Sequence, residues 1–282
     1  MSLRQVQRIA RPTTVEEAWA IRRAAPDASR FLAGGVDLVL YAPPSVTTLI
    51  DLSRLGLDGI REEGDDLVLG AMATLSQALE SPLVAGSAGG FLRDVLRRVA
   101  SPPQRNLATI GGAAVRGHPW SDVVTALLVL DAQLETYDGR EARLSLAAAG
   151  AGEGPSPLVR AIRIPGAWRG SRAAFEKFSR AAVDVAMLNC ACSALVERGT
   201  CREARVAVGG TPALARRLLD VERSLAGTKL TAVETRAAAE EAARGIEARD
   251  DLRASAAYRR RLARVGVKRC LESIAGRGEE TG

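Results

Sequence analysis

Phe31-Leu32-Ala33-Gly34-Gly35-Val36-Asp37-Leu38 is the stretch that decides how this 282-residue chain folds, and a second double glycine follows at Thr109-Ile110-Gly111-Gly112-Ala113. Each pair of glycines comes after a short apolar run, so the backbone can bend tightly there and present N–H groups that side chains would otherwise cover. Two such turns suit a diphosphate. No Gly-x-Gly-x-x-Gly opens a helix and no Gly-Lys-Ser/Thr occurs, which removes the Rossmann and P-loop interpretations.

A double glycine alone is a weak signal, because it also marks an ordinary hairpin or a strand-to-helix turn. The nearest other glycine-rich stretch is Gly150-Ala151-Gly152-Glu153-Gly154, and Pro155 and Pro157 follow it. We interpret that stretch as a surface linker.

The composition of the chain excludes two classes of protein. Hydrophobic residues make up 47%, which is enough for two or three cores. No window approaches the roughly 18 uninterrupted apolar residues of a membrane span and no apolar signal-peptide region opens the chain, so we expect a cytoplasmic protein. The net charge of +6 is dispersed among acidic residues and aromatic residues are only 4%, which argues against nucleic-acid binding.

Cysteine and histidine usage limits the chemistry. No Cys-x-x-Cys spacing occurs among the four cysteines, so we expect neither a disulfide nor a metal site from Cys190, Cys192, Cys201 and Cys270. His118 is the only histidine, and a zinc site or a Ser-His-Asp triad would need it as a central member. Its simplest role, between Gly117 and Pro119, is that of a solvated or loop-packing side chain.

Hydrophobic periodicity predicts a mixture of strands and helices. A helix over residues 14–25 can begin with a capping box formed by Thr14 and Glu17. The other expected helices begin at Thr74 or cover residues 91–99, 213–225, 231–248 and 254–274. The expected strands cover residues 30–32, 46–52, 67–69, 133–137, 143–146, 158–164, 188–196 and 201–208. Pro165-Gly166 closes one strand, so a domain boundary is expected near residues 165–172.

Further landmarks extend the pattern along the chain. Ser101-Pro102-Pro103-Gln104-Arg105-Asn106-Leu107 precedes the second double glycine, and His118-Pro119-Trp120-Ser121-Asp122 follows it. Phe175-Glu176-Lys177-Phe178-Ser179-Arg180 and Val208-Gly209-Gly210-Thr211-Pro212 come later. In order and spacing, and over nearly its whole length, the chain resembles the FAD-binding medium subunit of the molybdenum hydroxylases, the family of carbon monoxide dehydrogenase and xanthine dehydrogenase.

The resemblance implies an α+β fold with a two-lobed FAD-binding domain. Residues 1–56 would form a small α/β lobe, residues 57–167 a larger antiparallel-sheet lobe, and residues 168–282 a C-terminal flavoprotein domain of a sheet plus helices. The cofactor would be FAD, and the partners a molybdenum-cofactor large subunit and a [2Fe-2S] small subunit. Electrons would pass from the partner's clusters through FAD to an external acceptor such as NAD, a quinone or oxygen. The resemblance implies no catalytic acid or base in this chain.

The family's cofactor contacts carry over to seventeen positions: Phe31, Leu32, Ala33, Gly34, Gly35, Val36, Asp37, Leu38, Val99, Thr109, Ile110, Gly111, Gly112, Ala113, Asp122, Val159 and Lys177. The backbone N–H groups of both turns would hold the diphosphate, and the hydroxyl of Thr109 would add a donor. The carboxylate of Asp122 would accept from a ribityl or ribose hydroxyl. Val99, Val159 and Lys177 match positions against the flavin ring.

The chain departs from the family pattern at a few positions. Ala113 stands where asparagine is usual, Val36 where a threonine is common, and Arg116-Gly117-His118 replaces a run of small residues. Arg116 and His118 can serve the cofactor's phosphate or ribityl chain, or be ordinary surface side chains. The alternative functions are therefore an FAD-free binding or assembly protein on the same fold, and an unrelated scaffold whose glycine turns are only turns.

Overall fold

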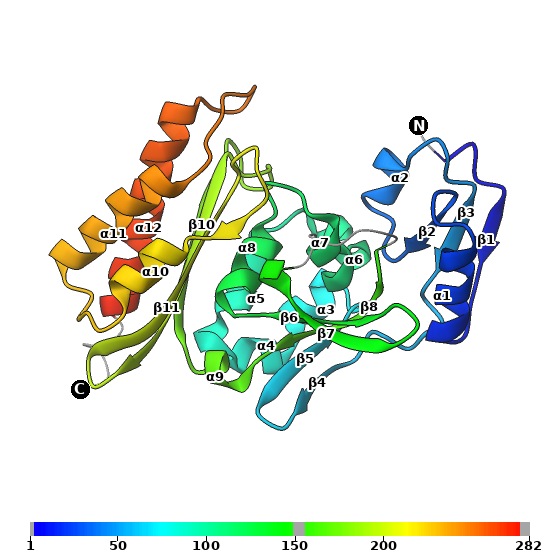
Figure 1. Cartoon of the computed structure of the whole chain (residues 1–282), viewed down its shortest axis with the longest axis horizontal. Helices are drawn as coiled ribbons and strands as arrows, with labels where there is room; N and C mark the ends of the chain where they lie inside the picture. Colours follow the sequence, from blue (N-terminus) through cyan, green and yellow to red (C-terminus); the bar gives the residue numbers. More distant parts are fainter. Residues whose placement is uncertain (1–2, 149–155, 277–282) are drawn as a thin grey trace.

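The computed structural model describes residues 3–148 and 156–276, so the surface linker predicted at residues 150–154 lies outside the described residues. Three sheets follow one another along the chain and across the molecule, with three, five and four strands (Figure 1). Helices accompany each sheet, which confirms the predicted α+β class. In the described part of the chain, no helix is both long and apolar enough to cross a membrane.

The first sheet belongs to a small N-terminal lobe. Its strands are all parallel and run in the order β1-β3-β2, with the bounds β1 Arg8–Ala10, β2 Ser29–Leu32 and β3 Thr48–Asp51. Helix α1, Val15–Ala24, begins as predicted at Thr14, whose hydroxyl accepts from the N–H of Glu17 at 3.1 Å. The first double glycine follows β2 and leads into the short helix α2, Leu38–Tyr41. The turn therefore lies at the carboxyl end of a parallel strand.

The second sheet is antiparallel, in the order β4-β5-β8-β6-β7. Its strands are β4 Ile60–Glu63, β5 Asp66–Gly70, β6 Gln133–Tyr137, β7 Glu141–Ser145 and β8 Leu158–Ile164. The hairpin predicted around Asp138-Gly139 is present as β6 and β7. A group of helices is inserted between β5 and β6: α3 Leu75–Glu80, α4 Pro82–Gly86, η1 Ala88–Gly90, α5 Phe91–Arg97, α6 Pro102–Leu107, α7 Ile110–Arg116 and α8 Asp122–Val129. The 3₁₀ turn η2, Leu146–Ala148, and helix α9, Gly166–Arg169, complete the lobe.

The third sheet is antiparallel and carries the last helices on one face (Figure 1). It runs in the order β12-β11-β10-β9, with β9 Arg172–Phe178, β10 Leu188–Glu197, β11 Thr200–Gly209 and β12 Arg216–Arg217. The helices are α10 Leu219–Leu225, α11 Ala232–Gly245 and α12 Ala256–Gly276. The prediction of a helix from residue 213 was wrong in its first half, because Arg216 and Arg217 pair with β11 instead.

Strand β10 is buried on both faces, and its side chains point alternately toward the C-terminal helices and toward the second lobe. Leu188, Cys190 and Cys192 pack with the C-terminal helices, whereas Ala191 belongs to the core of the second lobe. Asn189 has the same parity as Ala191, so its side chain points toward α8. A polar group is thereby placed between the second lobe and the third sheet.

Candidate functional site

The fold brings the two double glycines together, although they are far apart in the sequence. A Cβ placed on Gly34 would lie 1.7 Å from the carbonyl oxygen of Leu107, so the first turn packs against the backbone just before Thr109. Gly35 has φ +72°, a conformation that L side chains rarely adopt. Glycine is required at Gly34 by this close approach, and at Gly35 by the backbone angle.

The first turn presents unused donors. Among the described residues, no acceptor takes a hydrogen bond from the backbone N–H groups of Gly34, Gly35, Val36 or Asp37. Successive N–H groups of this kind form a concave site for an anion. This part of the predicted site has the chemistry that a diphosphate requires.

The second turn is built differently from the prediction, because Gly111 and Gly112 lie in the first turn of helix α7. The N–H groups of Ile110–Ala113 all bond within the chain at 2.8–3.1 Å, to the carbonyl oxygens of Ala71 and Ala73 and to the two oxygens of Thr109. The N–H donors expected from this turn are therefore engaged. The Thr109 hydroxyl accepts from Gly112, and among the described residues no acceptor takes its own proton.

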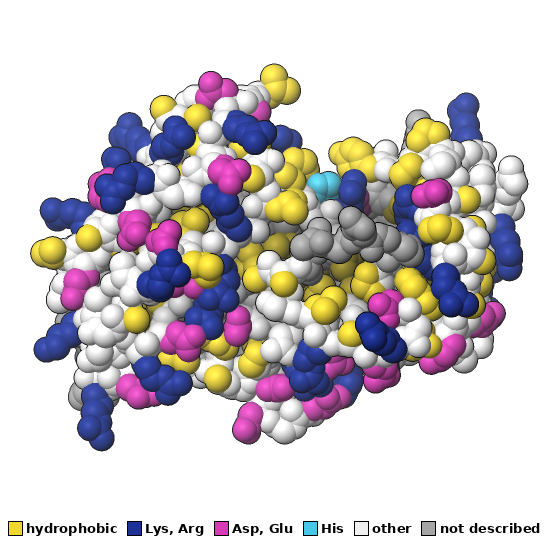
Figure 2. Space-filling view, viewed as in Figure 1, with side chains coloured by type: hydrophobic (Ala, Val, Ile, Leu, Met, Phe, Trp, Pro, Cys, Tyr) yellow, Lys and Arg dark blue, Asp and Glu magenta, His cyan; other side chains and the backbone are white. Residues whose placement is uncertain are grey.

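Asp37, in the first turn, is held by two side chains from the second lobe. Its carboxylate pairs with Nε of Arg116, the last residue of α7, and lies 2.5 Å from Nε2 of His118. His118 stacks on Trp120, with ring centroids 4.8 Å apart, and meets Tyr41 edge-on at 6.2 Å. Figure 2 shows the chain's one histidine in the hollow between the N-terminal lobe and the rest of the molecule. His118 is therefore partly buried at the edge of the site, at 26% exposure of its side chain, whereas Arg116 reaches Asp37 from the surface, at 45% exposure.

Asp122 and Lys177 form a buried ion pair between the second lobe and the third sheet. Lys177 Nζ lies 2.7 Å from Oδ2 of Asp122, and their side chains are 4% and 6% exposed. Asn189 donates to the other carboxylate oxygen at 2.7 Å, and Thr125 donates to the Asn189 amide oxygen at 2.8 Å. Burial raises the pKa of Asp122, and the charge of Lys177 opposes that rise. Sequence reasoning gave Asp122 and Lys177 separate cofactor contacts, whereas the structure pairs them with each other.

Asn189 and Thr125 were not predicted as part of this group. The signal in the sequence was an amide inside an otherwise apolar strand, since a buried amide needs hydrogen-bond partners. Thr125 lies one turn into α8 and gives no comparable signal.

The two other residues predicted to lie against the flavin ring, Val99 and Val159, lie in separate places. Val99 directly follows Arg98, whose carbonyl oxygen accepts from Lys177 Nζ at 3.0 Å, so Val99 lies beside the buried ion pair. Val159 pairs with Thr136 in the second sheet and belongs to that lobe's core.

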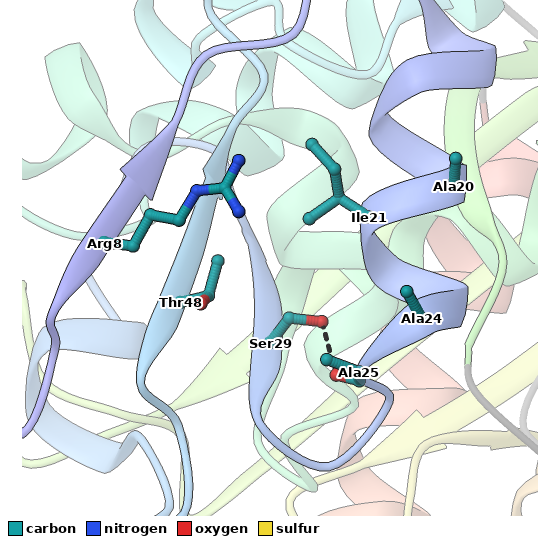
Figure 3. Close-up of a pocket in the computed structure, with 7 residues that line it drawn as sticks. All are labelled: Arg8, Ala20, Ile21, Ala24, Ala25, Ser29 and Thr48. Carbon is teal, nitrogen blue, oxygen red and sulfur yellow. Dashed lines mark hydrogen bonds between the residues drawn. The ribbon is translucent and has the colours of Figure 1, made fainter.

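Two hollows on the structure lie apart from the glycine turns. One, of about 320 Å³, lies between α1 and the first sheet; Figure 3 shows Arg8 and Ile21 across it, with the Ser29 hydroxyl bonded to the carbonyl of Ala25. The other, of about 220 Å³, lies between Trp120 and the start of α12. Neither is lined by a residue of either double glycine. The unused donors of the first turn, rather than a hollow, therefore define the candidate site.

Comparison with known proteins identifies the family of the chain. Residues 4–167 match the family described as the FAD binding domain in molybdopterin dehydrogenase, and residues 173–274 match the CO dehydrogenase flavoprotein C-terminal domain. The chain is 32% identical to the carbon monoxide dehydrogenase medium chain of Afipia carboxidovorans, covering 95% of this chain and 96% of the relative. It is 28% identical to the 6-hydroxypseudooxynicotine dehydrogenase complex subunit alpha of Paenarthrobacter nicotinovorans, covering 95% and 94%.

A solved structure gives the same result at the level of the fold. A chain of the carbon monoxide dehydrogenase from Hydrogenophaga pseudoflava that lacks the Mo-pyranopterin moiety superposes with a TM-score of 0.90 at 29% identity, covering 96% of this chain and 98% of that one. The chain therefore belongs to the family of FAD-binding medium subunits of the molybdopterin dehydrogenases, the family of the carbon monoxide dehydrogenase medium chain.

Proposed function

We propose that this chain relays electrons, receiving them from [2Fe-2S] clusters on a small partner subunit and passing them through FAD to an external acceptor such as NAD, a quinone or oxygen. A molybdenum-cofactor large subunit would oxidise the substrate. The observation that carries the proposal is the row of unused N–H donors at Gly34–Asp37, in a chain that belongs to an FAD-binding family. FAD, when bound, supplies the redox chemistry, and the protein supplies binding, orientation and electrostatics.

The residues of the first turn would hold the diphosphate of FAD. Their N–H groups are neutral donors, which can meet a dianion through dipoles without a lysine. The end of helix α6 supports the turn from behind, because Gly34 lies against the backbone at Leu107. The Thr109 hydroxyl, whose proton has no acceptor among the described residues, would add one further donor.

The buried pair of Asp122 and Lys177 would fix the other end of the site. It joins the second lobe to the third sheet, and the Arg98 carbonyl anchors the Lys177 ammonium from a third direction. Val99 follows this carbonyl and offers an apolar side chain for the flavin ring to pack on. Under this proposal the ion pair holds the ring's surroundings rigid rather than exchanging protons.

The proposal does not extend to a substrate. The two relatives named above are similar to this chain over almost their whole length, and their names refer to carbon monoxide and to 6-hydroxypseudooxynicotine. A fold that accompanies such different substrates does not select among them.

The test is to isolate the complex through an affinity tag on this chain and to measure its flavin, iron and molybdenum content. We expect FAD, iron and molybdenum to be recovered together, and the flavin to bleach when a reductant reaches the complex and recolour with the acceptor. A chain recovered alone and without flavin, even after incubation with FAD, would favour the FAD-free binding or assembly protein.

A further inference from the structure

The carboxylate of Asp37 creates an electrostatic problem at the candidate site. It belongs to the turn whose N–H groups have no partner among the described residues and would receive a diphosphate. Two unit charges 4 Å apart at a protein surface interact by about 4 kcal/mol, so a bare carboxylate there would oppose an anion. An anion site that contains Asp37 needs a compensating cation.

The structure provides that compensation on both carboxylate oxygens. Arg116 Nε reaches Oδ2, and His118 Nε2 lies 2.5 Å from Oδ1. Both come from the C-terminal end of α7 and the loop after it. One short stretch of the second lobe therefore meets both oxygens of the Asp37 carboxylate.

The aromatic surroundings hold the Arg116 and His118 side chains in place. The Arg116 guanidinium lies over the ring of Tyr41 at 5.7 Å, and the His118 imidazole is stacked on Trp120 with an interplanar angle of 14°. The guanidinium of Arg253, a residue of the loop before α12, also lies over the Trp120 ring, 4.8 Å from its centroid. The charged groups facing His118 are thus Asp37 directly, Arg116 beside it, and Arg253 across Trp120.

We propose that Arg116 and His118 are positioning residues that neutralise Asp37 and hold the first turn ready for the FAD diphosphate, and that protonation of His118 strengthens FAD binding. The inference rests on the proposed diphosphate site. The neutral imidazole can already donate to Asp37, and the imidazolium keeps that bond while adding one positive charge. An imidazolium at this position therefore favours FAD more than a neutral imidazole does, and imidazoles in general gain their charge at lower pH.

The test is the dissociation constant of FAD for the full chain, measured by flavin fluorescence from pH 5.5 to 8.5. For the wild type we expect binding to tighten by about threefold to fivefold toward low pH, the size expected of a partly exposed ion pair. His118→Gln keeps a neutral N–H donor but does not titrate, so its profile should be flat. Arg116→Gln should weaken binding about threefold to fivefold at every pH, because it removes a charge-assisted bond whose arginine is partly exposed.

Two further variants separate charge compensation from loss of folding. Asp37→Asn combined with Arg116→Gln removes both charges, so it should bind FAD more tightly than Arg116→Gln alone. Arg202→Gln removes an exposed arginine on the β10–β11 hairpin that pairs with Glu197, and should leave the profile unchanged. Thermal melts of each variant identify any that fail to fold.

The outcomes distinguish the two proposals. If the wild type binds FAD but His118→Gln shows the same pH profile as the wild type, the role of Arg116 and His118 is overturned and the FAD site stands. The same holds if Arg116→Gln binds FAD as tightly as the wild type. A wild-type chain that binds no FAD at any pH overturns the diphosphate site and this inference with it.

Discussion

Replacing Gly34 by alanine tests whether the close approach of the first double glycine to the end of α6 controls FAD binding. The new Cβ would lie 1.7 Å from the carbonyl oxygen of Leu107, whereas ordinary van der Waals contact begins at 3.4 Å. The obstacle is backbone and cannot rotate away, so the first turn must withdraw from the end of α6 by about the difference, 1.7 Å. The N–H groups of the turn move with it.

The magnitude follows from the cost of forcing atoms into a packed contact. Such overpacking costs about 1–3 kcal/mol, and each 1.4 kcal/mol changes a dissociation constant tenfold. If the strain falls on the turn that receives the diphosphate, Gly34→Ala should weaken FAD binding by about fivefold to 150-fold.

The assay is a fluorescence titration of FAD with the variant, together with the flavin retained after desalting and a thermal melt. Gly170→Ala is the matched control, because Gly170 has φ −90° and no atom within 4 Å of the added Cβ. A Gly34→Ala variant that binds FAD as tightly as the wild type would refute the reasoning.

Three other perturbations test the surrounding structure. Lys177→Met should lower the free energy of unfolding by about 3–5 kcal/mol, because it leaves Asp122 buried without its cation, and Asp122→Asn in the same chain should recover most of that loss in a denaturant titration; an equally unstable double variant would contradict the ion-pair account. The Gly166 N–H, by bonding to Asp66, holds the pKa of that carboxyl below its ordinary value. The stabilisation of the fold by the Asp66 carboxylate is therefore complete above about pH 3.9, the pKa of Asp in the unfolded chain, and is lost as the pH falls below that value. Asp66→Asn should therefore flatten the decline in melting temperature at acid pH, and an unaltered decline would contradict this role of Asp66. Burial raises the pKa of the Cys201 thiol to about 11, and all four cysteines are buried, so a thiol reagent at pH 8 should label none in the native chain and four after denaturation; rapid native labelling would show that the core is open.

Local signals in the sequence predicted much of the fold. The Thr14 cap, the hairpin at Asp138-Gly139 and the long strands of the third sheet depend on neighbouring residues and alternation, which a sequence displays directly. The first half of the helix predicted from residue 213 was wrong because Arg216 and Arg217 pair with β11, while the Arg217 side chain bonds to Glu222 of α10 and to Asp131 after α8. Tertiary contacts of that kind override local propensity.

The candidate site was predicted in part. The first double glycine has the unused N–H groups that its sequence suggested. The double glycine at Gly111-Gly112 has the same local pattern, but its segment donates to Ala71 and Ala73, whose carbonyl groups reach it only after folding. Likewise, nothing local indicated that Asp37 would meet Arg116 and His118, because these contacts join residues 79 and 81 positions apart.

The most direct test of the account is a crystal structure of the chain loaded with FAD. We expect oxygens of the diphosphate to accept hydrogen bonds from the backbone N–H groups of Gly34–Asp37, with the Thr109 hydroxyl also donating. A diphosphate bound elsewhere, such as in the hollow beside Arg8, with the N–H groups of the first turn still unpartnered, would contradict the account.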